Sequence, residues 1–254
     1  MGVVAMTGGA TGIGAAIRQQ LIADGHRVIV VDIQHADVVA DLSTAEGRAQ
    51  AVAGIRALAP DGLDGLVPCA GVGPHVKPHS LVTRINYFGA LATVEGLRDA
   101  LVQRGGAVVL ISSNSASMPG LDARYLELLK AGDEVGACAH IDTLDGHNAY
   151  AGGKYALTCW MRRHSAAWAA EGVRLNAVAP GITQTPLTIK ATEDAELGEA
   201  MKAFAATVPV GRVGQPEDIA HAVCFLLSPQ AAFICGSVLF VDGGHDAMLR
   251  PDAF

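Results

Sequence analysis

The sequence has few charged residues, few aromatic residues and no basic cluster. Only 17% of the 254 residues are charged and 5% are aromatic, and acidic residues outnumber basic ones by 25 to 18. Lysine and arginine gather only in short pairs such as Arg162 and Arg163. Because binding to nucleic acid or to an anionic membrane needs a basic patch, we expect neither as a partner.

Cysteine is also scarce. The five cysteines are odd in number and form no C-x-x-C pair. This pattern argues against a disulfide framework or a cysteine metal site and favours a reducing compartment. The first residues run directly into an apolar segment without room for a signal peptide, and no apolar segment has the length of a membrane span. We therefore expect a cytoplasmic protein without a metal.

Apolar residues are abundant, at 50% of the chain. Apolar runs of strand length alternate with helical segments, and no repeat, low-complexity tract or linker interrupts them. This alternation predicts an α/β fold: one domain over residues 1–254, a Rossmann-type doubly wound parallel sheet with helices on both faces. The expected strands are residues 2–6, 27–31, 38–40, 63–67, 107–111, 173–178 and 238–241, and the expected helices are residues 15–23, 44–58, 80–103, 149–170, 188–206 and 216–227.

A glycine-rich turn follows the first predicted strand and leads into a helix. It contains Gly8, Thr11, Gly12, Ile13 and Gly14. Glycines at this place allow a tight turn and let a phosphate approach backbone N–H groups at the positive end of the helix dipole. The turn therefore indicates dinucleotide binding, although its spacing differs from the common G-x-G-x-x-G pattern and a turn without a ligand is the alternative.

Carboxylates follow the second and third predicted strands. Asp32, at the tip of the second strand, can accept hydrogen bonds from both ribose hydroxyls and would repel a 2′-phosphate, which predicts NAD(H) rather than NADP(H). The alternative is a solvated loop carboxylate. Asp41 and Leu42 follow the third strand, where Asp41 either lies near the adenine amino group or caps the next helix.

Tyr150 and Lys154 lie one helical turn apart at the start of a predicted helix. A cation one turn away favours the phenolate and lowers the tyrosine pKa toward neutrality, which makes Tyr150 a candidate general acid/base. An ordinary amphipathic helix start would have the same spacing. Asn86, inside another predicted helix, indicates either a local kink with a bound water or simple tolerance.

Two further segments follow predicted strands. Ser112 and Ser113 stand at the end of a central strand, where ligands bind in parallel sheets. Residues 118–147 are rich in glycine, proline and charged residues, and we expect an insertion with some helix rather than core. His140 and His147 in this segment match no metal-site spacing, so a solvated loop is expected.

Together these motifs resemble the classical short-chain dehydrogenases/reductases over nearly the whole chain. The matching residues are Thr7, Gly8, Gly9, Gly12, Ile13, Gly14, Asp32, Asp41, Ala70, Gly71, Asn86, Ser113, Tyr150, Lys154, Pro180, Gly181 and Thr185, with Gly211 and Arg212 before residues 216–220.

The resemblance implies a catalytic tetrad. In it, Tyr150 exchanges the proton with the substrate oxygen, Ser113 rather than Ser112 hydrogen-bonds that oxygen, Lys154 lowers the tyrosine pKa and binds the nicotinamide ribose, and Asn86 holds a water. It also implies that Thr185 contacts the nicotinamide carboxamide. The implied cofactor contacts are Gly8, Thr11, Gly12, Ile13, Gly14, Asp32, Asp41, Leu42, Ala70, Gly71, Tyr150, Lys154, Pro180, Gly181, Ile182, Thr183 and Thr185.

The chain departs from the family pattern at two places. Cys69 stands where the family usually has Asn, so we expect the loss of a hydrogen bond between strands. The distance from Ser113 to Tyr150 exceeds that of plain members by about two dozen residues. We expect the inserted residues to form part of the substrate wall and to alter the helix packing of the usual tetramer, in a homo-oligomer that is a dimer or a tetramer.

The resemblance implies an NAD(H)-dependent oxidoreductase that interconverts a secondary alcohol and a ketone. Within the family it is strongest to members acting on a 3α-hydroxysteroid or another bulky hydrophobic carbonyl compound. An aromatic alcohol of the coniferyl type is the alternative substrate. A catalytically idle nucleotide-binding protein is the rival outside enzymes, because fold does not fix function.

Overall fold

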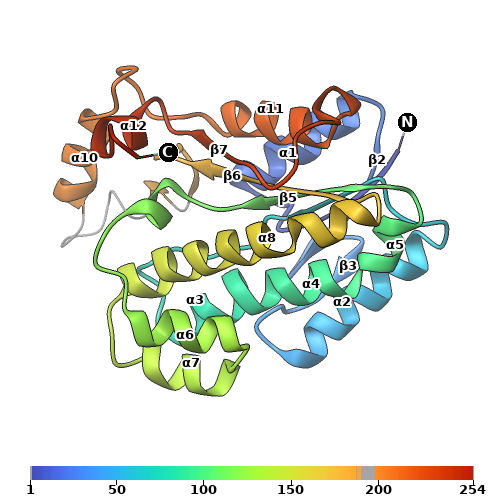
Figure 1. The fold of residues 1–254 in the computed structure, drawn as a ribbon, viewed down its shortest axis with the longest axis horizontal. Helices are drawn as coiled ribbons and strands as arrows, with labels where there is room; N and C mark the ends of the chain where they lie inside the picture. The colour runs from blue at the N-terminus through green and yellow to red at the C-terminus, as the bar shows by residue number, and fades with distance from the viewer. Residues whose placement is uncertain (1, 187, 190–197, 254) are drawn as a thin grey trace.

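A single parallel sheet organises the protein. The computed structural model describes residues 2–186, 188–189 and 198–253. Within these residues seven strands pair in the order β3-β2-β1-β4-β5-β6-β7 (Figure 1). The order reverses next to β1, so the crevice at the carboxyl ends of β1 and β4 is where ligands bind in such folds. The strands are β1 (Val3–Thr7), β2 (Arg27–Asp32), β3 (Val38–Val39), β4 (Gly65–Pro68), β5 (Ala107–Ile111), β6 (Arg174–Pro180) and β7 (Val238–Val241).

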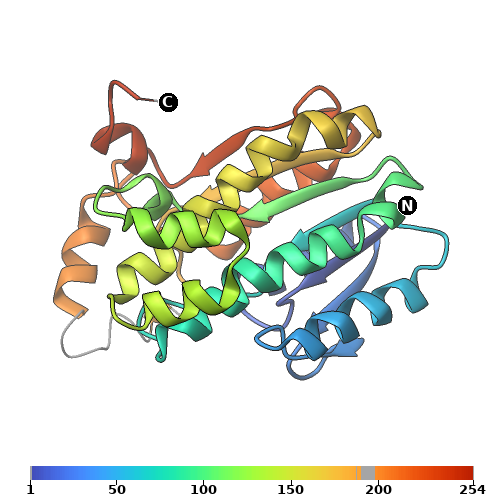
Figure 2. The ribbon, with the colours of Figure 1, turned by 60° about the horizontal axis from the view of Figure 1, so that its bottom comes forward.

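Helices cover both faces of the sheet. α1 (Gly12–Ala23) and α11 (Pro216–Leu227) lie together on one face (Figures 1 and 2). The other face carries α2 (Ala45–Leu58), α4 (Ala90–Gly96) and α8 (Gly153–Ala170). The predicted fold class is confirmed.

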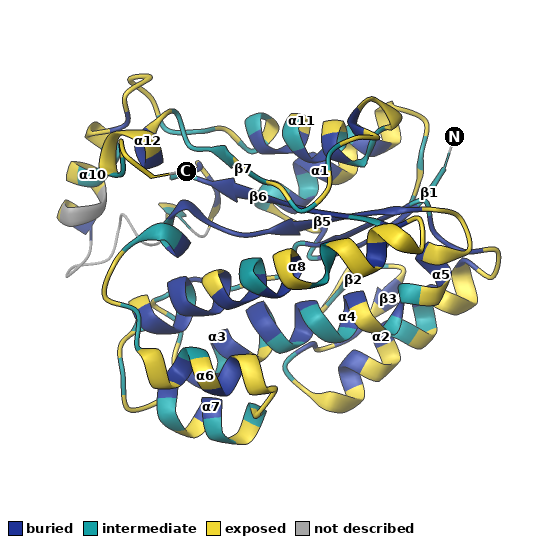
Figure 3. Ribbon diagram, viewed as in Figure 1, coloured by how far each residue is buried: buried dark blue, intermediate teal, exposed yellow. Residues whose placement is uncertain are grey.

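The core divides into two apolar clusters, one on each face. Ile17 and Val223 pack with Val109 on the α1 side, whereas Leu157 packs with Leu110 on the α8 side. Neighbouring residues of β5 thus point to opposite faces, and every residue of this strand is buried (Figure 3). The continuous apolar run that predicted a buried parallel strand is explained by this arrangement.

The helix expected over residues 80–103 is divided. It consists of α3 (His79–Thr83), the π-helical turn η1 (Arg84–Gly89), α4 and α5 (Arg98–Val102). A second π-helical turn, η3 (Asn148–Gly152), precedes α8. Each of these turns carries a predicted catalytic residue, Asn86 in η1 and Tyr150 in η3. Asn86 therefore lies in a π-helical turn rather than in a regular α-helix, and the kink with a bound water stays a prediction.

The expectation that residues 118–147 stay outside the core is wrong. They form two helices, α6 (Ala123–Ala131) and α7 (Glu134–Ile141), which pack beside α3 and α8 (Figures 1 and 2). Tyr125, Leu129 and Ile141 are fully buried or nearly so in the cluster on the α8 side. His140 also lies in a helix rather than a loop.

The remaining helices lie near the carboxyl ends of the strands or in the C-terminal part of the chain. Of the helix expected over residues 188–206, the structure shows α10 (Gly198–Ala206), while residues 190–197 lie outside the described residues. The last helix, α12, was not expected from the sequence. No helix in the described part of the chain is long and apolar enough to span a membrane. The 3₁₀ turns η2 (Asn114–Ser117) and η4 (Pro229–Ala231) and the helix α12 (His245–Leu249) complete the described elements.

Candidate active site

Ser113, Tyr150 and Lys154 converge at the carboxyl end of β5. Lys154 Nζ donates a hydrogen bond of 2.6 Å to the carbonyl oxygen of Ile111, the last residue of the strand. The same nitrogen lies 5.9 Å from the centre of the Tyr150 ring. The Ser113 side chain lies close enough to Tyr150 to lower the pKa of the tyrosine hydroxyl against the effect of burial. Three side chains of the predicted tetrad therefore share one location.

Ser112 and Ser113 have different surroundings. The Ser112 hydroxyl lies 2.7 Å from the Thr158 hydroxyl, one turn beyond Lys154 on α8. Ser113 Oγ instead accepts hydrogen bonds from the Ser115 hydroxyl and backbone N–H. Ser112 thus bonds to α8, whereas Ser113 acts on the pKa of Tyr150, and the choice of Ser113 over Ser112 stays a prediction.

Asn86 fixes the loop that follows β4. Its Oδ1 accepts a hydrogen bond of 2.9 Å from Val72 N, and its Nδ2 donates one of 2.9 Å to Val72 O. Asn86 is 1% exposed, and a Cβ on Gly71 would lie 3.2 Å from its Oδ1. The Asn86 side chain thus holds this loop through two hydrogen bonds. The water that the family resemblance implies at Asn86 stays a prediction.

The pKa of Tyr150 differs from the expectation that Lys154 lowers it. Burial raises the pKa of Tyr150, and the hydrogen bond from Ser113 opposes this rise. Burial lowers the pKa of Lys154 to about 8, because its ammonium group is enclosed with mostly uncharged neighbours. Among the protein's own groups, burial therefore outweighs the attraction that we expected.

Cys69 lies beside this cluster. Burial raises the pKa of its thiol to about 11, and the nearby Lys154 acts in the opposite direction. The thiol is therefore protonated at neutral pH. Strands β1 and β4 remain joined here through the backbone, since Cys69 N donates to Thr7 O and Ala70 N donates to Thr7 Oγ1. All five cysteines of the chain are unpaired.

The glycine turn has the shape that a dinucleotide requires. A Cβ on Gly14 would overlap the Gly8 carbonyl oxygen, and a Cβ on Gly8 would lie 2.5 Å from Ala70 Cα. Gly8 and Gly12 also have positive φ angles of 73° and 55°. The first turn of α1 carries no acidic residue, and the Thr11 side chain does not cap it. This leaves the helix N-terminus suited to a phosphate.

Asp32 faces the glycine turn from the tip of β2. Its Oδ2 accepts from Ala10 N at 3.1 Å and its Oδ1 from Ile33 N at 2.8 Å. Each carboxylate oxygen has further lone pairs for ribose hydroxyls. Asp41 accepts from Ser43 N, but Thr44, not Asp41, caps α2 by accepting from Gly47 N. The capping alternative for Asp41 is therefore wrong.

The segment after β6 lies over the glycine turn. A Cβ on Gly12 would meet Thr185 Cβ at 3.3 Å. The buried hydroxyl of Thr185 lies 2.8 Å from that of Thr188, which donates in turn to Thr183 O. Pro180, Gly181 and Ile182 connect this segment to the end of β6. The glycine turn, Asp32, Ala70 and Thr185 thus lie side by side, and these residues fit a dinucleotide. The other predicted cofactor contacts stay predictions.

The sequence did not reveal that the inserted helices hold both catalytic turns. The hydroxyls of Tyr125 and Thr83 lie 2.7 Å apart, which joins α6 to α3 just before η1. The Tyr125 ring packs against Gly152 in η3, where a Cβ would lie 3.0 Å from a ring carbon. Asn148 Oδ1, also in η3, accepts from Asp122 N at 2.7 Å. The glycine pair after Tyr150 was the available signal for this close packing.

Comparisons with known proteins agree with this geometry. Residues 2–124 match the short chain dehydrogenase family, and residues 134–246 match the family described as enoyl-(acyl carrier protein) reductase. A 3-alpha-hydroxysteroid dehydrogenase/carbonyl reductase of Comamonas testosteroni is 44% identical over 259 residues, covering 100% of both chains. A galactitol 2-dehydrogenase (L-tagatose-forming) of Cereibacter sphaeroides is 30% identical and covers 95% of this chain and 93% of its own.

The crystal structure of a 3-alpha-hydroxysteroid dehydrogenase from Pseudomonas sp. B-0831 in complex with NADH superposes with a TM-score of 0.96. It is 46% identical, and the match covers 99% of this chain and 100% of that one. The similarity includes the glycine turn, the Tyr150 helix and the two helices between Ser113 and Tyr150, since it spans the whole fold. The chain therefore belongs to the short-chain dehydrogenase family and is an oxidoreductase acting on hydroxyl and carbonyl groups.

Proposed function

We propose that the protein is an NAD(H)-dependent dehydrogenase that interconverts a 3α-hydroxysteroid, or another bulky hydrophobic secondary alcohol, and the corresponding ketone. The observation that carries this proposal is the convergence of Ser113, Tyr150 and Lys154 beside the glycine turn. The substrate class follows from the activities of the relatives at 44% and 46% identity.

Each residue of the cluster has a distinct task. Tyr150 takes the hydroxyl proton of the alcohol, or returns it to the ketone oxygen, and Ser113 orients that oxygen through a hydrogen bond. The Lys154 ammonium, fixed by the Ile111 carbonyl, binds the ribose of the nucleotide. Bound NAD(H) supplies the hydride transfer, for which the protein provides orientation.

The choice of NAD(H) over NADP(H) rests on Asp32. Its carboxylate is partly exposed at the tip of β2 and faces the turn in which Ala10 donates to it. Two ribose hydroxyls can donate to such a carboxylate, whereas a 2′-phosphate would be repelled by it. Asp41 and Leu42 complete the adenine side, and Thr185 contacts the carboxamide.

The substrate wall is proposed to include the inserted helices and the segment after β6. The Tyr125 ring contacts the turn of Tyr150, so the insertion borders the reacting centre. A homo-oligomer, as a dimer or a tetramer, and a cytoplasmic location stay predictions.

The test is NADH formation, followed at 340 nm, from 3α-, 3β- and 17β-hydroxysteroids and from aromatic secondary alcohols. Each alcohol is offered with NAD and with NADP. Turnover of a 3α-hydroxysteroid with NAD is expected. Turnover of aromatic alcohols alone would move the substrate class to the coniferyl type, and a preference for NADP would contradict the role of Asp32.

A further inference from the structure

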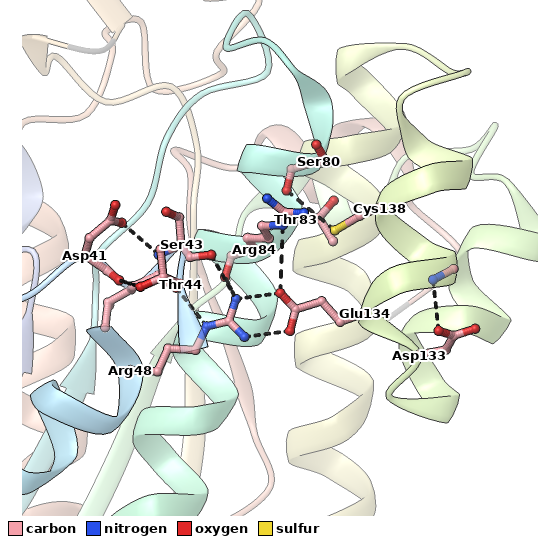
Figure 4. A network of polar contacts seen from close by, with 12 residues as sticks. Asp41, Ser43, Thr44, Arg48, Ser80, Thr83, Arg84, Asp133, Glu134 and Cys138 are labelled. Carbon is pink, nitrogen blue, oxygen red and sulfur yellow. Dashed lines mark hydrogen bonds and ion pairs between the residues drawn. The ribbon is translucent and has the colours of Figure 1, made fainter. Parts of the chain in front are cut away.

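Arg48 joins three segments of the chain that are far apart in sequence. It lies in α2, and the residue is 8% exposed. Its Nε donates a hydrogen bond of 2.8 Å to Leu42 O, and its two terminal nitrogens lie 2.7 and 2.8 Å from the two carboxylate oxygens of Glu134 (Figure 4). Glu134 begins helix α7 of the insertion. One guanidinium group therefore connects the insertion to the loop before α2.

The same guanidinium also reaches η1. Arg48 Nη2 lies 3.4 Å from both Ser43 O and Arg84 O, and Arg84 Nε lies 3.9 Å from Glu134 (Figure 4). Arg84 is the first residue of the turn that carries Asn86. The network thus reaches the edge of the catalytic cluster as well.

Leu42 is held closely between its neighbours. The residue is 5% exposed, and a Cβ on Gly89 would lie 3.0 Å from its Cβ and 3.3 Å from its carbonyl oxygen. A Cβ on Gly47 would overlap the carbonyl oxygen of the preceding residue, Asp41. Among the described residues, the hydrogen-bond donor to the Leu42 carbonyl is Arg48 Nε, so the direction of this carbonyl is coupled to the position of the guanidinium group.

The charge on Arg48 needs a partner. Its Nε bond and its 3.4 Å contacts are to neutral carbonyl oxygens, and Glu134 provides the opposite charge in a paired arrangement. A buried cation whose partner is removed is strongly destabilised and turns toward water where it can. Loss of the Glu134 charge would draw Arg48 outward and break its bond to Leu42 O.

We propose that Glu134 is a positioning residue for cofactor binding: through Arg48 it fixes the Leu42 carbonyl and so the Asp41–Leu42 segment that borders the adenine. This inference rests on the proposed function, in which Asp41 and Leu42 form the adenine side of the site. It gives the insertion a role in nucleotide affinity, in addition to its contacts with the catalytic turns.

The test compares Glu134→Gln with Glu127→Gln. Glu127 lies in the same insertion, but its side chain is 72% exposed and pairs with Arg124 at 3.7 Å. Dissociation constants for NADH and for ADP-ribose, which lacks the nicotinamide, are measured by calorimetry. Glu134→Gln is expected to weaken both by about 3- to 30-fold. Glu127→Gln should leave both unchanged.

Turnover separates positioning from general damage. At saturating NAD, Glu134→Gln should change kcat and the KM for the alcohol by less than about twofold, because a loss of uniform cofactor binding leaves the chemical step intact. A fall in kcat at saturating NAD without a loss of ADP-ribose affinity would overturn the inference. The double variant Arg48→Gln with Glu134→Gln should bind ADP-ribose no more weakly than Arg48→Gln alone, and additive losses would contradict the shared pathway.

Asp41→Ala separates failure of the inference from failure of the assigned site. If Asp41→Ala weakens ADP-ribose binding and Glu134→Gln does not, the inference fails and the adenine assignment stands. If Glu134→Gln weakens ADP-ribose binding and Asp41→Ala does not, the coupling stands and the adenine assignment of Asp41 fails.

Discussion

The hydrogen bond between Tyr125 and Thr83 should stabilise the protein as a pair rather than as two separate groups. The two hydroxyls are 2.7 Å apart and both residues are fully buried. Burial raises the pKa of Tyr125, so the phenol stays neutral and the bond joins two neutral groups. Removal of one partner leaves the other hydroxyl buried without a good replacement. Among the described residues, the other hydrogen bond of Thr83 Oγ1, to His79 O, is 3.5 Å long.

The expected free energies follow from this geometry. Tyr125→Phe and Thr83→Val should each lower the free energy of unfolding by about 1–2 kcal/mol, since each leaves an unsatisfied buried hydroxyl. The double variant should cost little more than either single one, because valine replaces threonine with nearly the same shape and no unpaired group remains. The expected coupling is about 1 kcal/mol.

Urea denaturation of the four proteins, followed by circular dichroism, measures these differences. Each kcal/mol should also move the melting temperature by about 2–4 °C for a chain of this size. Activity at saturating substrate should be nearly unchanged in Tyr125→Phe, since the ring that supports Gly152 is retained. Strictly additive losses in the double variant would refute the argument that this bond joins the insertion to α3.

Three further outcomes are expected. Gly14→Ala should abolish NADH binding, measured by calorimetry, because its Cβ would overlap a backbone oxygen of the glycine turn. Gly152→Ala should lower kcat about tenfold, since its Cβ would lie 3.0 Å from the Tyr125 ring, whereas at Gly153 the nearest atom is 3.9 Å away and kcat should be retained. Burial lowers the pKa of Lys154 in the folded protein to about 8, whereas the unfolded chain holds this proton up to the ordinary lysine pKa of about 10.4. The free energy of unfolding of the wild type should therefore rise with pH between these two values. The stability of Lys154→Met relative to wild type should therefore fall by about 2 kcal/mol between about pH 7 and about pH 10, as urea denaturation would show, and a constant difference would contradict this pKa.

The sequence predicted the sheet well because its central strands β4, β5 and β6 are buried on both faces. The apolar run over residues 107–111 matches β5 at both ends, and Pro216 marks the first residue of α11. Such signals are local. Asp32 and the glycine turn were likewise recognisable from their places at the ends of strands.

The insertion and the π-helical turns could not be predicted in the same way. Tyr125 and Leu129 are spaced as on any amphipathic helix, and only contacts with α3 and α8 show that they enter the core. The change from α- to π-helical hydrogen bonding at Asn86 and Tyr150 depends on tertiary packing. Asn86 alone left a kink and simple tolerance both open, and Gly152 meets the Tyr125 ring of α6 only in the folded chain. The pKa of Tyr150 was mispredicted because burial is also a tertiary property.

The central claim is that Tyr150 exchanges the proton with the substrate oxygen. Tyr150→Phe is compared with the control variant Tyr155→Phe. Tyr155 lies on α8 and is 41% exposed to solvent. At saturating NAD and with a 3α-hydroxysteroid, Tyr150→Phe should lower kcat by about 10²- to 10⁴-fold, while Tyr155→Phe keeps wild-type turnover. Retention of most of the turnover by Tyr150→Phe would contradict the account.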